Sequence, residues 1–135
     1  MIVAMAAMGL CVSSCDAGEK ILVLSPVDFQ KSVLSDSTAV VLDVRRPDEY
    51  AEGHLSGAQS LDWLDAETFA QGMERLDKTK TYYVYCRSGR RSHDAAEKMM
   101  AVGLHVVDME GGYLAWTDKG LPVVKAEADE EVSSH

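Results

Sequence analysis

Three short apolar runs constrain most strongly how this chain can fold. They span residues 39–44, 81–85 and 104–109, and they are rich in the β-branched and aromatic side chains that favour strands. The run 39–44 is almost continuously apolar, which is typical of a strand covered on both faces. Segments of helical composition lie between the runs, and the connections are short. This alternation predicts an α/β fold, in which a small, mainly parallel sheet carries helices on both faces.

Turn and capping residues indicate where the other elements lie. Ser25, Pro26 and Asp28 form a typical helix start, because serine caps the free N–H groups while proline and aspartate suit the first turn. Glycines 53 and 103 can end two of the expected helices. The remaining expected elements are helices over 47–52, 66–76 and 92–102, a short helix that ends at Trp116, and a short strand over 58–61.

The N-terminal segment differs from the middle of the chain. Residues 1–12 carry no charge, and such a run is shorter than the roughly 20 apolar residues that span a bilayer. It matches the hydrophobic region of a secretory signal, which typically has about 7–15 residues. Cys15 follows an apolar residue and two serines, which resembles the lipobox of bacterial lipoproteins, where cleavage leaves a lipid-bearing cysteine. Signals begin with basic residues, however, and the first one here is Lys20, so an apolar N-terminus without a signal is the alternative.

These features predict how the chain is organised. We expect a signal segment over 1–14, a linker over 15–23, one folded domain over 24–123 and an acidic solvated tail over 124–135. With a signal, the protein is anchored to the membrane through lipid on Cys15 and is periplasmic or in the cell envelope. Without a signal it is cytoplasmic. The sequence leaves this choice and the oligomeric state open.

Composition excludes several classes of function. The formal net charge is −9, from 13 Lys and Arg against 22 Asp and Glu, which argues against nucleic acid as a partner. A small anion in a local basic pocket stays compatible with this balance. Three cysteines are too few for a disulfide framework. His93 and His105 have no neighbour at metal-ligand spacing, so we expect neither a metal nor a cofactor.

One segment combines the features of a reactive site. Cys86 ends the run 81–85, and the carboxyl ends of parallel strands are where ligands bind in such sheets. Gly89 permits a loop whose N–H groups point inward, and the start of the next helix adds free N–H donors. Three arginines lie within five positions of the sulfur, and such surroundings favour the thiolate form of a cysteine. The loop that should bind an anion consists of Arg87, Ser88, Gly89, Arg90, Arg91 and Ser92.

The chain resembles single-domain rhodanese-like sulfurtransferases, over about residues 24–123. The first matching motif is Asp43-Val44-Arg45, followed by Glu49-Tyr50 and by Gly53-His54-Leu55-Ser56-Gly57-Ala58. The second is Tyr83-Val84-Tyr85-Cys86-Arg87-Ser88-Gly89-Arg90-Arg91-Ser92, and the third is Gly111-Gly112-Tyr113-Leu114-Ala115-Trp116. The three motifs stand in the family's order and spacing. Ser56 departs from the family, which often has proline there.

The resemblance implies a mechanism and a fold. Cys86 would take the outer sulfur of a donor such as thiosulfate, become a persulfide and pass that sulfur to cyanide or a thiol. The loop amides from Arg87 to Arg91 would hold the anionic donor, and we expect Arg87 or Arg91 to matter most for thiosulfate. Asp43 and Arg45 could tune the site, but an ion pair that orients the loops is the simpler interpretation. We likewise expect a structural hydrogen bond at His54 and a position in the core or in a pocket wall for Trp116.

Two other functions stay open at this stage. Cys-dependent phosphatases and arsenate reductases of the cell-cycle phosphatase type share the fold, but their loop has an arginine six positions after the cysteine. That position is Ser92 here, and Arg91 comes one residue early. The second alternative is a domain that binds partners or carries persulfide sulfur without turnover. The presence of Cys86 argues against a purely binding role but leaves the carrier possible.

Overall fold

The computed structural model describes residues 20–125. The predicted signal segment 1–14, its lipidation residue Cys15 and residues 126–135 of the predicted tail therefore lie outside the described residues. Within residues 20–125, no helix is long and apolar enough to cross a membrane.

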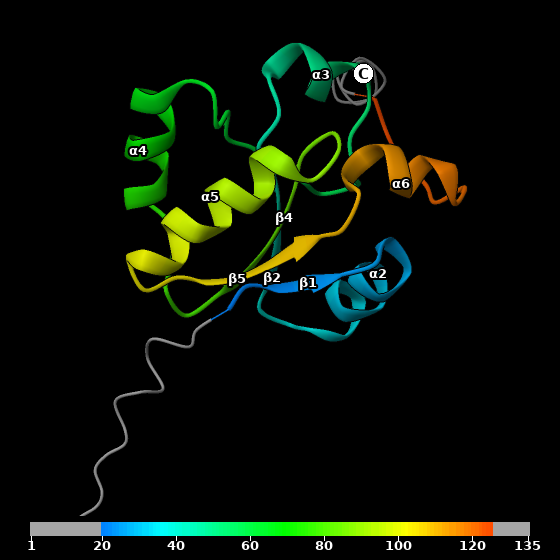
Figure 1. Cartoon of the computed structure of the whole chain (residues 1–135). Helices are drawn as coiled ribbons and strands as arrows, with labels where there is room; N and C mark the ends of the chain where they lie inside the picture. The colour runs from blue at the N-terminus through cyan, green and yellow to red at the C-terminus, as the bar shows by residue number, and fades with distance from the viewer. Residues whose placement is uncertain (1–19, 126–135) are drawn as a thin grey trace, which may run out of the picture.

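A five-stranded parallel sheet forms the centre of the domain (Figure 1). Its order is β1-β5-β4-β2-β3, and each pair of neighbours is parallel. The strands are β1 (Leu22–Leu24), β2 (Ala39–Asp43), β3 (Gln59–Ser60), β4 (Thr81–Tyr85) and β5 (His105–Met109). β4 lies between β5 and β2, so the strand that leads to Cys86 is in the middle of the sheet. The predicted fold class is confirmed.

Helices cover both faces of the sheet (Figure 1). They are α2 (Pro26–Ser35), α3 (Pro47–Glu52), α4 (Ala66–Glu74), α5 (Arg90–Ala101) and α6 (Gly112–Asp118). Side chains alternate along β4, so Tyr82 and Val84 face one core while Tyr83 and Tyr85 face the other.

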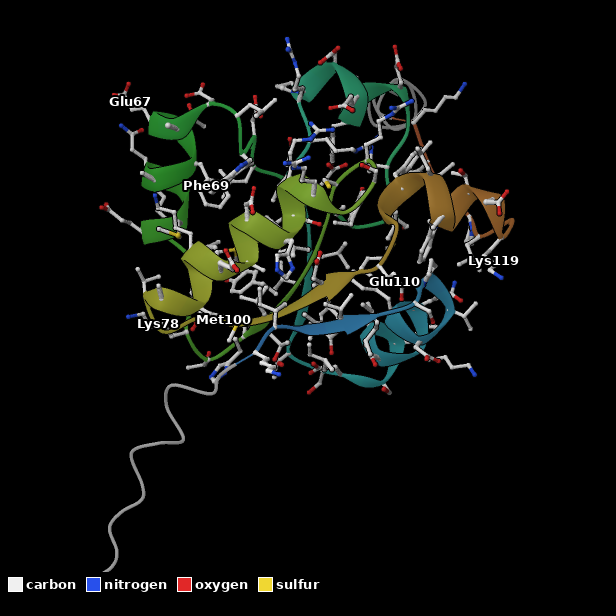
Figure 2. All side chains as sticks on the ribbon, viewed as in Figure 1. Glu67, Phe69, Lys78, Met100, Glu110 and Lys119 are labelled. Atoms are coloured by element: carbon white, nitrogen blue, oxygen red, sulfur yellow. The ribbon has the colours of Figure 1, made fainter. Side chains whose placement is uncertain are left out.

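Each face of the sheet has its own apolar core. One core lies under α4 and α5, and Phe69 points into it from α4 whereas Glu67 of the same helix points outward (Figure 2). The other core lies under α2 and α6, where Phe29 packs edge to face against Tyr83 and Trp116. Trp116 is therefore a core residue, as predicted. The predicted cap of α2 is also present, since Ser25 Oγ accepts a hydrogen bond from the N–H of Asp28 at 3.2 Å.

The structure corrects two predicted boundaries of the domain. β1 begins at Leu22, inside the predicted linker 15–23, and it pairs with β5. Val124 forms an antiparallel bridge with His54, so the described domain extends one residue into the predicted tail. Both segments are short, and pairing with a distant strand gives them their structure, so local pattern alone does not reveal them.

The structure also corrects the start of the helix after Cys86. α5 begins at Arg90, two residues earlier than the predicted 92–102, because Gly89 caps it in a left-handed conformation with φ of +108°. The turn from β4 into α5 is consequently shorter than the sequence suggested.

Candidate active site

Cys86 lies directly after the central strand, at the edge of the sheet where the strands have their carboxyl ends. It is only 1% exposed and is a free cysteine. Its Sγ accepts a hydrogen bond from the backbone N–H of Gly89 at 3.0 Å. A buried sulfur with an N–H donor aimed at it is in a position that stabilises negative charge on that sulfur.

The start of α5 provides further donors near the sulfur. The first N–H groups of a helix have no acceptor within it, and the helix dipole makes this end positive. Gly89 precedes the twelve-residue helix α5, and its carbonyl accepts the first intrahelical bond, from the N–H of His93 at 3.2 Å. The free amides of the first turn therefore lie beside the loop that contains Cys86, which is the arrangement that binds anions at helix N-termini.

Gly112, the first residue of α6, brings this helix against the same loop. The N–H of Tyr113 donates to the carbonyl of Cys86 at 2.7 Å, and the N–H of Leu114 donates to that of Arg87 at 3.0 Å. A Cβ on Gly112 would lie 2.5 Å from the carbonyl oxygen of Cys86 and 2.6 Å from that of Arg87. Only a glycine at 112 permits this approach, so α6 supports the loop through backbone contacts.

The three loop arginines have different environments. Arg87 and Arg90 are exposed, and neither forms an ion pair with another described residue. Arg91 is partly buried and holds Glu49 of α3 through two hydrogen bonds, of 2.9 and 3.2 Å. The hydrogen bond with Glu49 raises the pKa of Arg91 and the same bond lowers the pKa of Glu49. Arg91 is thus fixed in place, whereas Arg87 and Arg90 are free to meet a ligand.

Ser88 and Ser92 also differ. Ser88 is exposed in the turn, whereas Ser92 is fully buried and its Oγ donates to the carbonyl of Gly89 at 3.3 Å. The side chain of Ser92 therefore stabilises the loop through this buried hydrogen bond and does not line an open pocket. The sequence predicts that the whole segment 87–92 binds the anion, and the geometry leaves Ser92 only a backbone N–H for that purpose.

Asp43 and Arg45 form the buried ion pair that the sequence suggested. Arg45 Nη2 lies 2.7 Å from Asp43 Oδ2 and also donates to the carbonyl of Gly53 at 2.6 Å. Burial lowers the pKa of Arg45, but the hydrogen bond and charge of Asp43 outweigh it and raise the pKa above its ordinary value. The pair orients the segment around Gly53, so the structural interpretation is supported.

Tyr85 completes this buried cluster, and sequence reasoning missed it. Its hydroxyl donates to Asp43 Oδ2 at 2.7 Å and accepts from the N–H of Leu55 at 3.1 Å. Burial and the neighbouring Asp43 raise the pKa of Tyr85, so the phenol stays neutral. His54 is also structural, since its Nδ1 lies 2.8 Å from the carbonyl oxygen of Tyr50 and its ring stacks on Tyr50.

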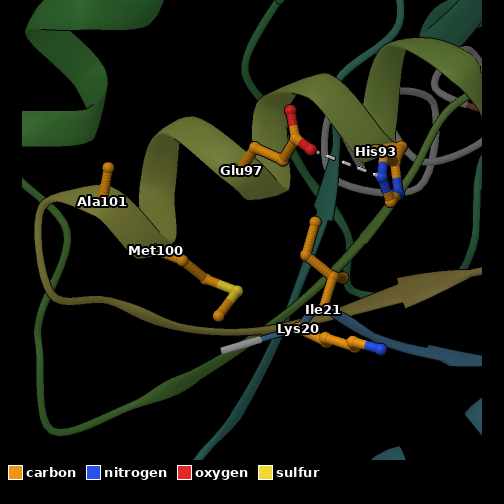
Figure 3. Close-up of a pocket in the computed structure, with 6 residues that line it drawn as sticks. All are labelled: Lys20, Ile21, His93, Glu97, Met100 and Ala101. Atoms are coloured by element: carbon orange, nitrogen blue, oxygen red, sulfur yellow. Dashed lines mark ion pairs between the residues drawn. The ribbon is translucent and has the colours of Figure 1, made fainter. Parts of the chain in front are cut away.

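Two cavities adjoin α5 and the loop. One of about 250 Å³ lies beside the Cys86 loop, lined by Arg45, Glu49, Glu52, Gly53, Arg87, Tyr113 and Leu114. A larger one of about 470 Å³ lies between α5 and the residues that precede β1 (Figure 3). It is lined by Lys20, Ile21, His93, Glu97, Met100 and Ala101. Cys86 lines neither cavity, but the smaller one is lined by Arg87, the residue that follows Cys86, so it is the better candidate for substrate access.

Comparison with known proteins agrees with this geometry. Residues 25–119 match the rhodanese-like domain family. A sulfurtransferase of Allochromatium vinosum is 35% identical over 96 residues, which cover 70% of this chain and 87% of the relative. Thiosulfate sulfurtransferase 16, a chloroplastic protein of Arabidopsis thaliana, is 33% identical over 91 residues, covering 60% and 76%. The crystal structure of a rhodanese-related protein from Thermoplasma volcanium superposes with a TM-score of 0.67 and 29% identity, covering 78% and 98%.

Replacing Gly112 tests the contact between α6 and the loop. Gly112→Ala should destabilise the fold by about 2–5 kcal/mol, because it adds overpacking against the backbone of Cys86 and Arg87 to the strain of a positive φ. Gly57→Ala is the matched control, since Gly57 also has a positive φ, of +79°, but open space around its Cβ position. Urea unfolding measures both variants, and equal losses would contradict the packing argument.

Replacing Glu49 tests its ion pair with Arg91. The pKa of Glu49 is lower in the folded than in the unfolded protein, so its ionised form stabilises the fold above the ordinary value of 4.5. That contribution is lost as the pH falls through the lower folded value. Glu49→Gln should therefore be less stable than the wild type at pH 7, and the difference should shrink below about pH 4. Thermal unfolding across this range checks it, and a constant difference would contradict the assignment.

Proposed function

Because the chain belongs to the rhodanese-like family, we propose that it is a sulfurtransferase that uses a persulfide on Cys86. The proposed donor is thiosulfate or a similar anion with a sulfane sulfur, and the acceptor is cyanide or a thiol. The observation that carries this proposal is the hydrogen bond from the Gly89 N–H to Cys86 Sγ at the start of α5.

The proposed reaction has two covalent steps. The Cys86 thiolate attacks the outer sulfur of thiosulfate, the S–S bond of the donor breaks, and its electron pair leaves with sulfite. Cys86 is then a persulfide anion. A cyanide ion or a thiolate attacks the terminal sulfur, the bond between the two sulfurs breaks, and its electron pair returns to Cys86. The products are thiocyanate or a new persulfide, and the enzyme is restored.

The described residues have separate roles in this proposal. The N–H of Gly89 and the free amides of the first turn of α5 stabilise negative charge on the thiolate and on the persulfide. Arg87 and Arg90 attract the anionic donor, because they are exposed and without ion pairs to described residues. Arg91 is held by Glu49 and contributes a fixed positive charge near the sulfur.

The short loop disfavours the phosphatase alternative. Three residues separate Cys86 from the first residue of α5, and position 92 is a buried serine where the phosphatase pattern has arginine. A turn of this size offers few amides to a tetrahedral phosphoryl group. Hydrolysis of an aryl phosphate by the purified protein would contradict our proposal.

Mass spectrometry tests the persulfide. After treatment with thiosulfate, the intact protein should gain the mass of one sulfur atom on Cys86 and lose it again on addition of cyanide. Cys86→Ser is the control and should gain nothing. Repeated formation of thiocyanate then separates an enzyme from a carrier that reacts once. An unchanged mass of the wild type would overturn the proposal.

We also propose that residues 1–14 are a cleaved signal and that Cys15 carries a lipid anchor in the periplasm or cell envelope. The support is the uncharged run 1–12 and the two serines before Cys15. The full chain, expressed in a bacterium with radioactive palmitate, should be labelled. Cys15→Ser should lose the label and Cys11→Ser, the matched control, should keep it. A wild type without label would contradict the anchor.

A further inference from the structure

Four of the described residues that line the cavity beside the Cys86 loop are charged, and two of these are compensated within the protein. Arg45 pairs with the buried Asp43, and Glu49 holds Arg91. The other two charged groups are one carboxylate and one guanidinium, and neither forms an ion pair with a described residue. The cavity therefore presents one negative and one positive charge to whatever enters it.

Glu52 is the uncompensated acid of this cavity. It is exposed, and it is the last residue of α3, whose last turn holds no basic residue. The carboxyl end of a helix is negative, and Asp48 lies four positions earlier with the same charge, so both surroundings disfavour a carboxylate here. Glu52 also repels the anionic donor of the proposed reaction. Neither helix stability nor donor binding accounts for an acid at this position.

Arg87 is the uncompensated base, and its backbone joins the reactive loop to the wall of the cavity. The N–H of Leu114 donates to the carbonyl of Arg87 at 3.0 Å, and the N–H of Tyr113 donates to the carbonyl of Cys86 at 2.7 Å. Tyr113 and Leu114 both line the cavity. α3 ends against the same wall, because a Cβ on Gly53 would overlap the hydroxyl of Tyr113. α3 and α6 accordingly lie at the same end of the sheet (Figure 1).

One kind of molecule satisfies both charges at once. In the proposed reaction sulfite leaves before the acceptor enters, so the acceptor meets both side chains free. A simple anion leaves Glu52 unpaired, and a simple cation leaves Arg87 unpaired, whereas a molecule with an ammonium and a carboxylate group can pair with both. The cavity of about 250 Å³ has the volume of about eight water molecules at about 30 Å³ each, which is room for a small amino acid.

We propose that the sulfur acceptor is a small thiol that carries both an ammonium and a carboxylate group, and that Glu52 and Arg87 select it. This inference rests on the proposed function. The acceptor thiol loses its proton to water, and its thiolate attacks the terminal sulfur of the Cys86 persulfide. The bond between the two sulfurs breaks, its electron pair returns to Cys86, and the acceptor leaves as a persulfide. Glu52 pairs with the ammonium group and Arg87 with the carboxylate.

The test measures how fast a preformed Cys86 persulfide loses its terminal sulfur to four small thiols at pH 7. L-Cysteine is a zwitterion, cysteamine is a cation, 3-mercaptopropionate is an anion and 2-mercaptoethanol is uncharged. Mass spectrometry follows the loss of sulfur at low thiol concentration. Each rate is divided by the 2-mercaptoethanol rate of the same variant, and variants are compared thiol by thiol. Differences in folding and in the intrinsic reactivity of each thiol then cancel.

The two charges predict a crossed pattern. Glu52→Gln should lower the ratio about threefold for L-cysteine and cysteamine and raise it about threefold for 3-mercaptopropionate, as expected for an exposed ion pair. Arg87→Gln should lower the ratio for L-cysteine and 3-mercaptopropionate and raise it for cysteamine. Glu74→Gln is the matched control, because Glu74 is also exposed and is the last residue of α4, but lines a different cavity. It should change no ratio.

Flat ratios would overturn the inference. If Glu52→Gln slows all four thiols equally, Glu52 has only a structural role and the inference fails. If Arg87→Gln cannot be loaded with sulfur, Glu52→Gln alone decides, since it must still separate cysteamine from 3-mercaptopropionate. If thiosulfate leaves the mass of the wild type unchanged, the proposed function fails and the acceptor role fails with it. A persulfide that forms and shows flat ratios removes this inference alone.

Alkylation tests whether the cavity is the route to the sulfur, without any sulfur transfer. Iodoacetate is an anion and iodoacetamide is uncharged, and the mass of the peptide that contains Cys86 gives the rate for each. The ratio of the iodoacetate rate to the iodoacetamide rate should rise about threefold in Glu52→Gln and fall about threefold in Arg87→Gln. An unchanged ratio in both variants would overturn the inference, because the two charges would then not act on what reaches Cys86.

Discussion

The four-residue turn 86–89 from β4 into α5 is the constraint on which the site depends. It brings a buried sulfur to the positive end of a helix, and it does so only because Gly89 adopts a φ of +108°. A side chain there would cost about 1–3 kcal/mol in backbone strain. Its Cβ would also lie 3.4 Å from the backbone nitrogen of Gly111, where α6 approaches. One glycine therefore serves both the turn and the contact with α6, and the N–H of that glycine is the donor to Cys86.

The buried cluster of Asp43, Arg45 and Tyr85 holds the segment after α3 in place against β4. A buried ion pair gains little stability against an apolar alternative, and removing one partner typically costs about 3–5 kcal/mol. Here every group has partners, since Arg45 also bonds to Gly53 and Tyr85 also bonds to Leu55. The cluster thereby fixes the segment after α3 against β4. α3 carries Glu49, so the same cluster helps to set where Arg91 is held.

The sequence predicted the helices and strands whose residue patterns lie within a single short segment. The strands 81–85 and 39–43 have continuous apolar character, and Cys86 ends the first of them, so the position of the sulfur could be inferred. Three features could not be predicted from the sequence, because each depends on contacts between residues that are far apart in the chain. β1 has three residues, two of them exposed, and gains its structure from β5. The pair of Glu49 and Arg91 joins residues 42 positions apart. The run 81–85 predicts a strand position for Tyr85, whereas its role in the cluster depends on contacts with Asp43 and Leu55.

The start of α5 was misplaced for a different reason. The helix formers from Ser92 onward suggest a start at that residue, but Ser92 lies inside the first turn and is fully buried. The real cap is Gly89, which has no side chain to signal the position. The error matters for the chemistry, because a helix that begins at Arg90 brings its free amides closer in sequence to the sulfur than one that begins at 92.

The charge around the sulfur follows from these contacts and limits what the arginines can do. Glu49 compensates Arg91, which leaves Arg87 and Arg90 as exposed cations on a chain with a net charge of −9. Exposed charges are screened by salt over about 8 Å at physiological ionic strength, whereas buried donors are screened much less. Under the proposed function, the exposed arginines therefore act mainly on the approach of the anionic donor. Stabilisation of charge on the sulfur itself comes from the backbone N–H groups, which are fixed by glycine, by Ser92 and by the packing of α6.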